Sequence, residues 1–306
     1  MEDFSKRISK GSPPLPPRIV IIGEEGVGKS TAGLALPSPL FICAEDGLVG
    51  RNFKDTNQFH PTSWQDTLDH ARWMAEADHP YKSYILDTVD WIEPLVISHI
   101  LTRDKTTFTD ISQYKNGAGY IAVASEFRLL ISELDSLRRH GLHTMLLFHS
   151  KITNFSNPTG DDYSRFASEA LRKVGSLARQ WADLIIFAQF ETITKQVSVP
   201  FGKQTKAFGG KRRLAQMEHS AAWDAKTRFN IPTVMEFDMS QILWEIQHEG
   251  ETQIKQIIQA INLTLPTIPP DIRAQALTYL SDNADNFPKL QALLSRLNSI
   301  PKEGEK

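Results

Sequence analysis

The fold is decided by the stretch RIVIIGEEGVGKST, residues 18–31. A short β-branched run opens it and leads directly into a glycine-rich loop, after which a helix is expected. Glycines allow such a loop to curl until its backbone N–H groups face a phosphate, and the helix directs its positive N-terminal end to the same place. The pattern predicts a phosphate-binding loop. Its residues are Gly23, Glu24, Glu25, Gly26, Val27, Gly28, Lys29, Ser30 and Thr31.

Three side chains of the predicted site follow from this loop. We expect Lys29 to contact the β- and γ-phosphates of ATP, and Ser30 to hold Mg²⁺. Asp87 closes an apolar strand predicted over residues 83–87, and a carboxylate at the carboxyl end of a strand lies on the ligand side of an open α/β sheet. The alternative is an aspartate that caps a turn or a helix. We favour Asp87 as the other Mg²⁺ ligand, so ATP and Mg²⁺ are the expected cofactors.

Two further polar residues end predicted strands and are candidate catalytic residues. Glu45 follows the run that starts at Leu40, and a carboxylate one strand over from the glycine loop would supply the base that hydrolysis needs. A surface glutamate has equal weight on spacing alone. His149 follows residues 144–148, where a polar group would sense the γ-phosphate. On spacing alone, a strand-end histidine satisfied by its neighbours is the stronger interpretation.

The pattern outside the loop predicts an α/β fold with a mostly parallel sheet covered by helices. We divide the chain into a flexible Pro-rich tail (1–17), an ATPase core (18–238) and a small helical C-terminal region (239–306). An antiparallel hairpin is expected over residues 192–199 and 206–214. The expected strands are 18–22, 40–44, 83–87, 144–148 and 184–190, and the expected helices of the core are 64–77, 91–101, 121–139 and 166–181.

Composition limits the function classes. The chain has 306 residues, a formal net charge of −2 and one cysteine, Cys43. No apolar run approaches ~18 residues, so no membrane span is expected, and a lone cysteine in an apolar run indicates a core residue. These features fit a cytoplasmic protein. Residues 151–228 hold 13 Lys and Arg against 7 Asp and Glu, which is compatible with a polyanion site. On charge alone, an ordinary uneven surface is the simpler explanation.

Several of these segments together resemble the RecA-type ATPase core. FICAEDGL, residues 41–48, looks like the second-strand signature in which recombinases carry a catalytic glutamate, here Glu45. Leu86-Asp87-Thr88 is similar to the Walker B strand. DAKTRF, residues 224–229, resembles the Lys-x-Arg motif of DnaB-type helicases and bacterial RadA. The resemblance implies that Lys226 and Arg228 are catalytic in trans, at the γ-phosphate of a neighbouring subunit.

Residues 18–235 also resemble phage and prophage ATP-binding proteins of the Sak type, which are RecA-like proteins assigned to single-strand annealing and recombination. The likeness rests on the phosphate loop, GAGY at 117–120, FHSK at 148–151 and residues 223–232. The sequence departs from DnaB-type proteins, which usually have Gly where Asn230 stands. It also departs from RecA, which has an Asn-Gln pair near His149-Ser150. The residues that respond to the bound nucleotide can therefore differ from those of RecA and DnaB-type proteins even where the fold is the same.

The RecA-like resemblance implies DNA binding through two mobile loops, which match residues 102–119 and 151–165. Long polar loops are unusual inside a compact domain unless they are functional, and cations with interleaved rings suit a single strand. Disordered surface loops are the alternative. A basic cluster (Lys203, Lys206, Lys211, Arg212 and Arg213) is a further candidate, with a solvated hairpin face as its alternative. The candidate DNA-binding residues are Arg103, Lys105, Tyr114, Lys115, Lys151, Phe155, Tyr163 and Arg165.

The leading hypothesis is a phage-encoded RecA-like protein that hydrolyses ATP, binds single-stranded DNA and promotes annealing or recombination as an oligomer. Its expected partners are further copies of the chain in a ring or filament, single-stranded DNA and a single-strand DNA-binding protein, with no membrane. A ring-type DNA helicase or translocase is one alternative. A nucleotide-dependent switch or scaffold without a nucleic-acid role is another, and the net charge of −2 slightly favours it.

Overall fold

The computed structural model describes residues 15–45, 48, 53–199, 202–249, 251–284 and 287–300. Contacts divide the chain into a larger unit, residues 1–228 with 233–239, and a smaller unit, residues 229–232 with 240–306. Most of the predicted tail lies outside the described residues. At its described end, the carbonyl of Pro16 accepts a hydrogen bond of 2.6 Å from Arg138.

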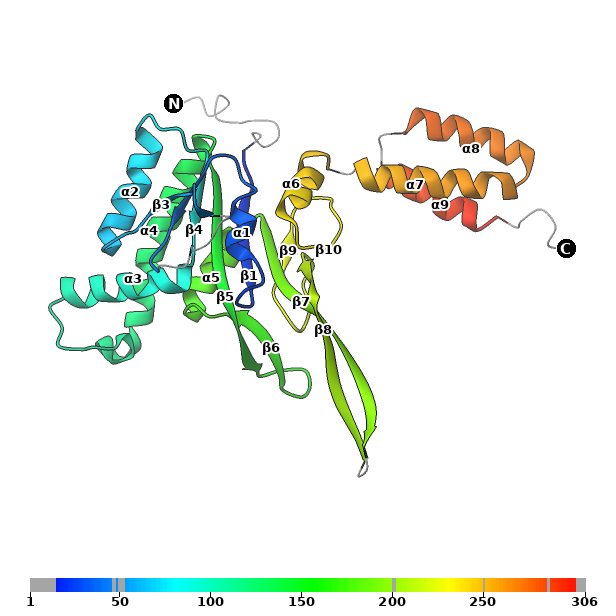
Figure 1. Cartoon of the computed structure of the whole chain (residues 1–306). Helices are drawn as coiled ribbons and strands as arrows, with labels where there is room; N and C mark the ends of the chain where they lie inside the picture. The colour runs from blue at the N-terminus through cyan, green and yellow to red at the C-terminus, as the bar shows by residue number, and fades with distance from the viewer. Residues whose placement is uncertain are drawn as a thin grey trace, which may run out of the picture. The chain divides into compact units, whose positions relative to one another are not determined.

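The larger unit is built on a 10-stranded sheet (Figure 1). Eight strands follow the order β10-β8-β7-β1-β5-β4-β2-β3, and off this path β6 pairs with β5 and β9 with β7. Its centre is parallel, because β1 pairs in parallel with β5 and β7, and β4 with β5 and β2. The predicted mostly parallel sheet is confirmed. The strands are β1 (Arg18–Gly23), β2 (Pro39–Ile42), β3 (Asn57–Phe59), β4 (Ser83–Leu86), β5 (His143–Phe155), β6 (Tyr163–Ser168), β7 (Leu184–Val199), β8 (Gly202–Gln216), β9 (Lys226–Thr227) and β10 (Val234–Glu236).

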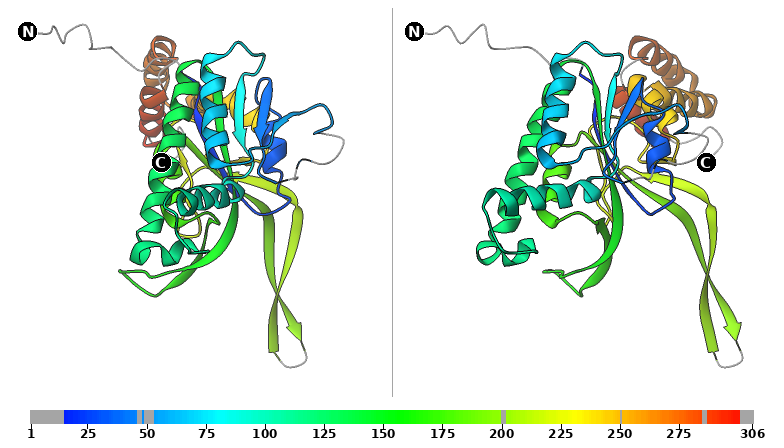
Figure 2. Two further views of the ribbon diagram at one scale, coloured as in Figure 1. Left: turned by 90° about the vertical axis from the view of Figure 1, so that its left-hand side faces the viewer. Right: turned by 60° about the vertical axis from the view of Figure 1, so that its left-hand side comes forward.

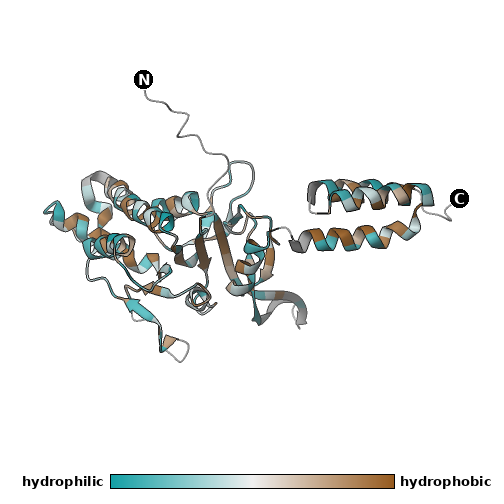
Figure 3. Ribbon diagram, turned by 90° about the horizontal axis from the view of Figure 1, so that it is seen from above, coloured by the Kyte–Doolittle hydropathy of each residue, from teal (hydrophilic) through white to brown (hydrophobic). Residues whose placement is uncertain are grey.

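Helices cover both faces of this sheet, because successive strand residues point to opposite sides. Val20 packs into a large apolar core with α2, α3, α4 and α5. On the other face Gly33 of α1 lies so close to Phe41 and Ile85 that a Cβ there would clash. Figure 2 shows these layers, and Figure 3 shows apolar strands between them. The helices are α1 (Lys29–Gly33), α2 (Trp64–Glu76), α3 (Val89–Arg103), the 3-10 helix η3 (Ile111–Gly117), α4 (Gly119–Arg139) and α5 (Arg172–Trp181).

Three predictions about this unit differ from the structure. The helix predicted over residues 166–181 begins only at Arg172, because residues 163–168 form β6. That strand pairs antiparallel with the end of β5, so the loop predicted at 151–165 is a β-ribbon. The other predicted loop, 102–119, contains the end of α3 and all of η3. Both segments contain helix or strand that their polar composition concealed.

Two β-ribbons extend beyond the carboxyl ends of the central strands, and we call this end of the sheet its carboxyl edge. Gly23 ends β1 and is level with His149 of β5 and Ala188 of β7. Beyond that level β5 continues with β6, and β7 continues with β8 as a long antiparallel arm (Figure 1). Both ribbons therefore extend past the carboxyl end of β1, which is where the phosphate loop begins.

The smaller unit is helical and has its own apolar core. The helices are α6 (Met239–Gln247), whose first residue belongs to the larger unit, α7 (Glu251–Thr264), η4 (Leu265–Thr267), α8 (Pro270–Asp282) and α9 (Phe287–Asn298). Its buried core residues are Ile261, Leu265, Ile268, Ala276, Leu290 and Leu297. In neither unit do the described residues include a helix long and apolar enough to cross a membrane.

Candidate functional site

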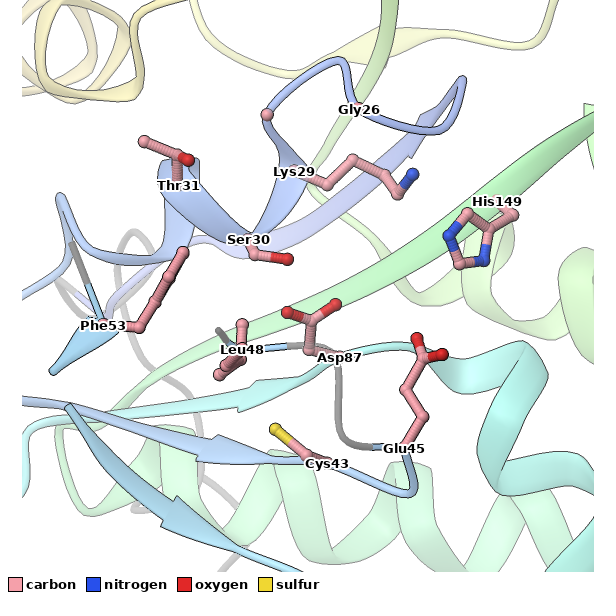
Figure 4. A pocket seen from close by; sticks show the side chains of 11 residues that line it. Gly26, Lys29, Ser30, Thr31, Cys43, Glu45, Leu48, Phe53, Asp87 and His149 are labelled. Atoms are coloured by element: carbon pink, nitrogen blue, oxygen red, sulfur yellow. The ribbon is translucent and has the colours of Figure 1, made fainter. Parts of the chain in front are cut away.

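A cavity of about 310 Å³ lies between the phosphate loop and the carboxyl ends of the central strands (Figure 4). It brings together Lys29, Ser30, Glu45, Asp87 and His149, which the sequence suggested from separate segments. The rest of the lining is Gly26, Gly28, Thr31, Cys43, Leu48 and Phe53. The parallel sheet explains this convergence, because the carboxyl ends of its strands share one edge.

The phosphate loop has the curled backbone that its glycines allow. Gly26 and Gly28 have φ values of 71° and 105°, in the left-handed region that favours glycine. The Lys29 ammonium donates hydrogen bonds to the carbonyls of Gly23 and Glu24, at 3.1 and 3.0 Å. Burial lowers the pKa of Lys29, and the charges of Asp90 and Asp87 oppose that effect. The loop thus holds a cation at the centre of its curl, where a phosphate would meet it.

Ser30 and Asp87 fit a magnesium site. Burial raises the pKa of the Asp87 carboxyl, while a hydrogen bond from Ser30 and the charge of Lys29 lower it. Oδ2 of Asp87 is buried, and no described residue gives it a hydrogen bond. Mg²⁺ is held by one or two carboxylates with phosphate oxygens and waters, so it does not require the cluster of three acidic or imidazole groups that the described residues lack.

Glu45 reaches the cavity, although the prediction that it stands one strand over from the loop is wrong. Strands β5 and β4 lie between β1 and β2. Figure 4 shows the carboxylate directed between Asp87 and His149. Burial raises the pKa of Glu45, and the charge of His149 opposes the shift. A partly desolvated carboxylate in this place is able to accept a proton from water.

Asp90 is the partner of His149, a contact that the sequence pattern did not reveal. Its Oδ2 lies 2.6 Å from Nδ1 of His149, and its Oδ1 accepts the backbone N–H of His149 at 3.0 Å. The hydrogen bond to Asp90 raises the pKa of His149. Burial raises the pKa of Asp90, but the bonds from His149 outweigh it and leave that pKa lowered. A carboxylate one helical turn after Asp87, at the start of α3, was the available signal.

The structure does not bring Lys226 and Arg228 to this cavity. Their strand β9 pairs with Leu184 and Ile185 at the amino end of β7. There the Arg228 guanidinium lies 3.1 Å from Asp183, and Lys226 Nζ donates to the carbonyl of Arg179 at 3.1 Å. The two side chains therefore lie at the amino ends of the central strands, opposite their own phosphate loop. We call this end of the sheet its amino edge.

Two of the four candidate DNA-binding residues of the first segment are engaged within the chain. Tyr114 is buried and its hydroxyl donates to Asp104, so the prediction that its ring stacks on a base is wrong. Arg103 lies 2.9 Å from Asp104 and 2.6 Å from Glu126. Lys105 is exposed, and the side chain of Lys115 lies outside the described residues.

The ribbon of β5 and β6 groups the candidates of the second segment. The rings of Phe155 and Tyr163 are 5.2 Å apart, and the Arg165 guanidinium stands 5.5 Å from the Phe155 ring. Arg165 also pairs with Asp224 at 2.6 Å. Lys151 is exposed and donates to the carbonyl of Glu169. On the arm of β7 and β8, the side chains of Lys203 and Lys206 lie outside the described residues, whereas Lys211, Arg212 and Arg213 are exposed.

Comparison with known proteins agrees with this geometry. A family model described as an AAA domain matches residues 15–229, which is more than half of the chain. The matched range contains the phosphate loop, all the lining of the cavity and both β-ribbons. No curated protein matches the sequence.

Proposed function

The chain belongs to the AAA domain family of P-loop ATPases, and on that premise we propose that it couples ATP hydrolysis to single-stranded DNA annealing or recombination as an oligomer. The supporting observation is that two β-ribbons leave the sheet at the edge that carries the ATP cavity. The likeness to Sak-type proteins adds a phage origin to the proposal.

The cavity supplies the groups that hydrolysis needs. The loop N–H groups and Lys29 bind the phosphates. Ser30 and Asp87 would hold Mg²⁺, which neutralises charge on the β- and γ-phosphates. Glu45 accepts the proton of the attacking water, and its burial makes it a stronger base than an exposed carboxylate. His149 donates to the γ-phosphate, with its ring orientation fixed by Asp90.

Strand β5 offers a physical link from nucleotide to DNA. His149 lies on this strand beside the cavity, and the ribbon pairing begins at the next residue, Ser150. Farther along, Phe155 and Tyr163 present adjacent rings with Arg165 beside them. Rings that stack on bases next to a cation suit a single strand of any sequence. A change at His149 on hydrolysis would therefore reach the ribbon through one continuous strand.

The positions of Lys226 and Arg228 support the oligomer in this proposal. Lys226 and Arg228 lie at the edge opposite their own loop, so a contact with a γ-phosphate requires a second subunit. Arg228 keeps an exposed fraction of 57% beside its partner Asp183. Such a side chain is available to a neighbour in a ring or filament.

The test compares ATPase rate and DNA binding for the wild type and Phe155→Ala. We expect single-stranded DNA to stimulate hydrolysis, and the variant to bind an oligonucleotide about 5- to 100-fold more weakly, as loss of one base stack predicts. Leu129→Ala, an exposed apolar residue on α4, is the control and should bind normally.

Absence of both stimulation and binding at low salt, where phosphate contacts are strongest, would exclude the DNA proposal and favour a nucleotide switch. Displacement of a strand from a forked duplex would instead favour the helicase alternative, because annealing alone does not open a duplex.

A further inference from the structure

Arg213 lies against the phosphate loop of its own chain. A Cβ built on Gly28 would stand 3.0 Å from Nη1 of Arg213. Gly28 directly precedes Lys29 and lines the ATP cavity. The guanidinium is therefore within reach of the loop that would bind phosphates. The sequence pattern gave no reason to separate this residue from the other members of the basic cluster.

Strand pairing explains the placement. Arg213 of β8 is level with Phe190 of β7, two residues beyond Ala188, which is itself level with Gly23. The guanidinium stands 5.8 Å from the ring centroid of Phe190, within the range of a cation–π contact. The carbonyl of Arg213 accepts a hydrogen bond of 2.9 Å from Phe237. The backbone of Arg213 is thus held on both sides, and its side chain is supported by a ring.

The charge of Arg213 is not balanced within this part of the chain. Neighbouring side chains on a strand point to opposite faces, and Arg212 accordingly lies 3.6 Å from Glu191. No carboxylate among the described residues lies within ion-pair distance of Arg213. A cation supported by a ring, next to a phosphate loop and without an anionic partner there, fits an anionic ligand held by that loop.

We propose that Arg213 is a second phosphate-binding cation of the ATP site, acting in cis beside Lys29. A guanidinium presents its donors as a planar fork that contacts two phosphate oxygens at once, which an ammonium does not. The inference rests on the proposed ATP binding and not on the proposed DNA role. Contact with DNA phosphates, as suggested for the basic cluster as a whole, is the competing role that the test must exclude.

The experiment measures the affinity of a fluorescent ATP analogue with Mg²⁺ for the wild type, Arg213→Ala, Arg213→Lys and Arg212→Ala. Loss of charge-assisted hydrogen bonds predicts about 10- to 100-fold weaker ATP binding for Arg213→Ala. Arg213→Lys should fall between that variant and the wild type, because it keeps the charge and loses the fork. Arg212→Ala should keep the wild-type ATP affinity. The dissociation constant of adenosine, obtained by competition, should be the same in all four proteins, because adenosine has no phosphate.

The outcomes separate the two proposals. A wild-type protein that binds no ATP analogue overturns the proposed function itself. Normal ATP binding by the wild type and an equal affinity for Arg213→Ala overturn only the role of Arg213. Loss of oligonucleotide binding without loss of ATP binding assigns Arg213 to DNA and also overturns the inference. At an ATP concentration too low to saturate Arg213→Ala, mixing it with Lys29→Ala protein should restore no hydrolysis, because both substitutions damage the same side of one site; restored hydrolysis would overturn the action of Arg213 in cis.

Discussion

The carboxyl edge and the amino edge of the central sheet carry similar charged groups, but these groups have different neighbours. At the carboxyl edge, Lys29 and Asp87 line an open cavity, and one oxygen of Asp87 has no hydrogen bond from a described residue. At the amino edge, the Asp183 carboxylate accepts the N–H of Arg18 at 3.2 Å and lies 3.4 Å from Arg138 and 3.1 Å from Arg228. Similar charges thus face a cavity at one edge and each other at the opposite edge.

This difference shows what each edge is able to do alone. The carboxyl edge has unsatisfied groups around a space, which is the arrangement of a binding site. At the amino edge, the arginines around Asp183 are paired with that carboxylate within one chain, so they act on a nucleotide only if a second chain approaches. The proposed function therefore makes each chain one half of a shared site.

Arg228→Ala is the change with the largest expected effect. An arginine that stabilises the transition state in trans contributes about 10³–10⁵-fold to the rate, so hydrolysis should fall by about that much while ATP binding is unchanged. Mixing this protein with Lys29→Ala protein should restore part of the activity, because each variant damages a different side of the interface. Phosphate release and binding of an ATP analogue are measured in parallel.

Arg138→Ala is the matched control, because Arg138 contacts the same carboxylate with 19% of its side chain exposed. In either variant Asp183 keeps the other arginine and the backbone N–H of Arg18, so the fold should survive. If both variants lose the same stability and neither shows the expected loss of hydrolysis, Arg228 is structural. A monomeric wild type with full activity at micromolar concentration would also refute the shared site.

Glu45→Gln tests the carboxyl edge with a somewhat smaller expected effect. Loss of a general base lowers a rate by about 10²–10⁴-fold, while the amide keeps the size of the side chain. We expect slow hydrolysis with unchanged ATP affinity in a single-turnover assay. Glu218→Gln, which alters an exposed glutamate outside the cavity, should behave as the wild type. A rate above a tenth of the wild-type value would assign the base to another group.

The sequence allowed the parallel core to be predicted because its strands are short apolar runs buried on both faces. It misled at residues 151–168, where polar side chains alternate on a ribbon that leaves the sheet. Each face of this ribbon mixes apolar and polar residues, so the sequence pattern predicts a loop at Tyr163 and a helix at Phe166. Only the pairing with β5 shows them to be strand residues.

The cavity was predictable where a local motif fixes the chemistry, as at Lys29 and Asp87. The sequence did not indicate Asp90, and it did not separate Arg213 from the rest of the basic cluster, for a different reason. Each is identified by a neighbour distant in sequence, His149 for one and Gly28 for the other. A single sequence does not record such contacts. The position of Arg228 at the far edge likewise depends on the pairing of a two-residue strand, β9, with the start of β7.

The smallest predicted effect concerns the ion pair of His149 and Asp90 and its dependence on pH. Asp90 raises the pKa of His149 above its ordinary value of 6.5, so the protonated histidine stabilises the folded chain. That contribution is fully present below pH 6.5 and is lost as the pH rises through the folded pKa. It is also lost in acid, as the pH falls through the lowered pKa of Asp90.

His149→Asn should therefore lower the free energy of unfolding most between these limits, at about pH 5.5, and little at pH 9. A hydrogen bond between charged groups contributes about 1.5–3 kcal/mol, and the partial exposure of His149 places the expected loss near the lower end. Urea unfolding at both pH values measures it, with the exposed His140→Asn as the control. A loss that is equal at the two pH values would show that packing, and not the ion pair, holds His149 at the edge of the cavity.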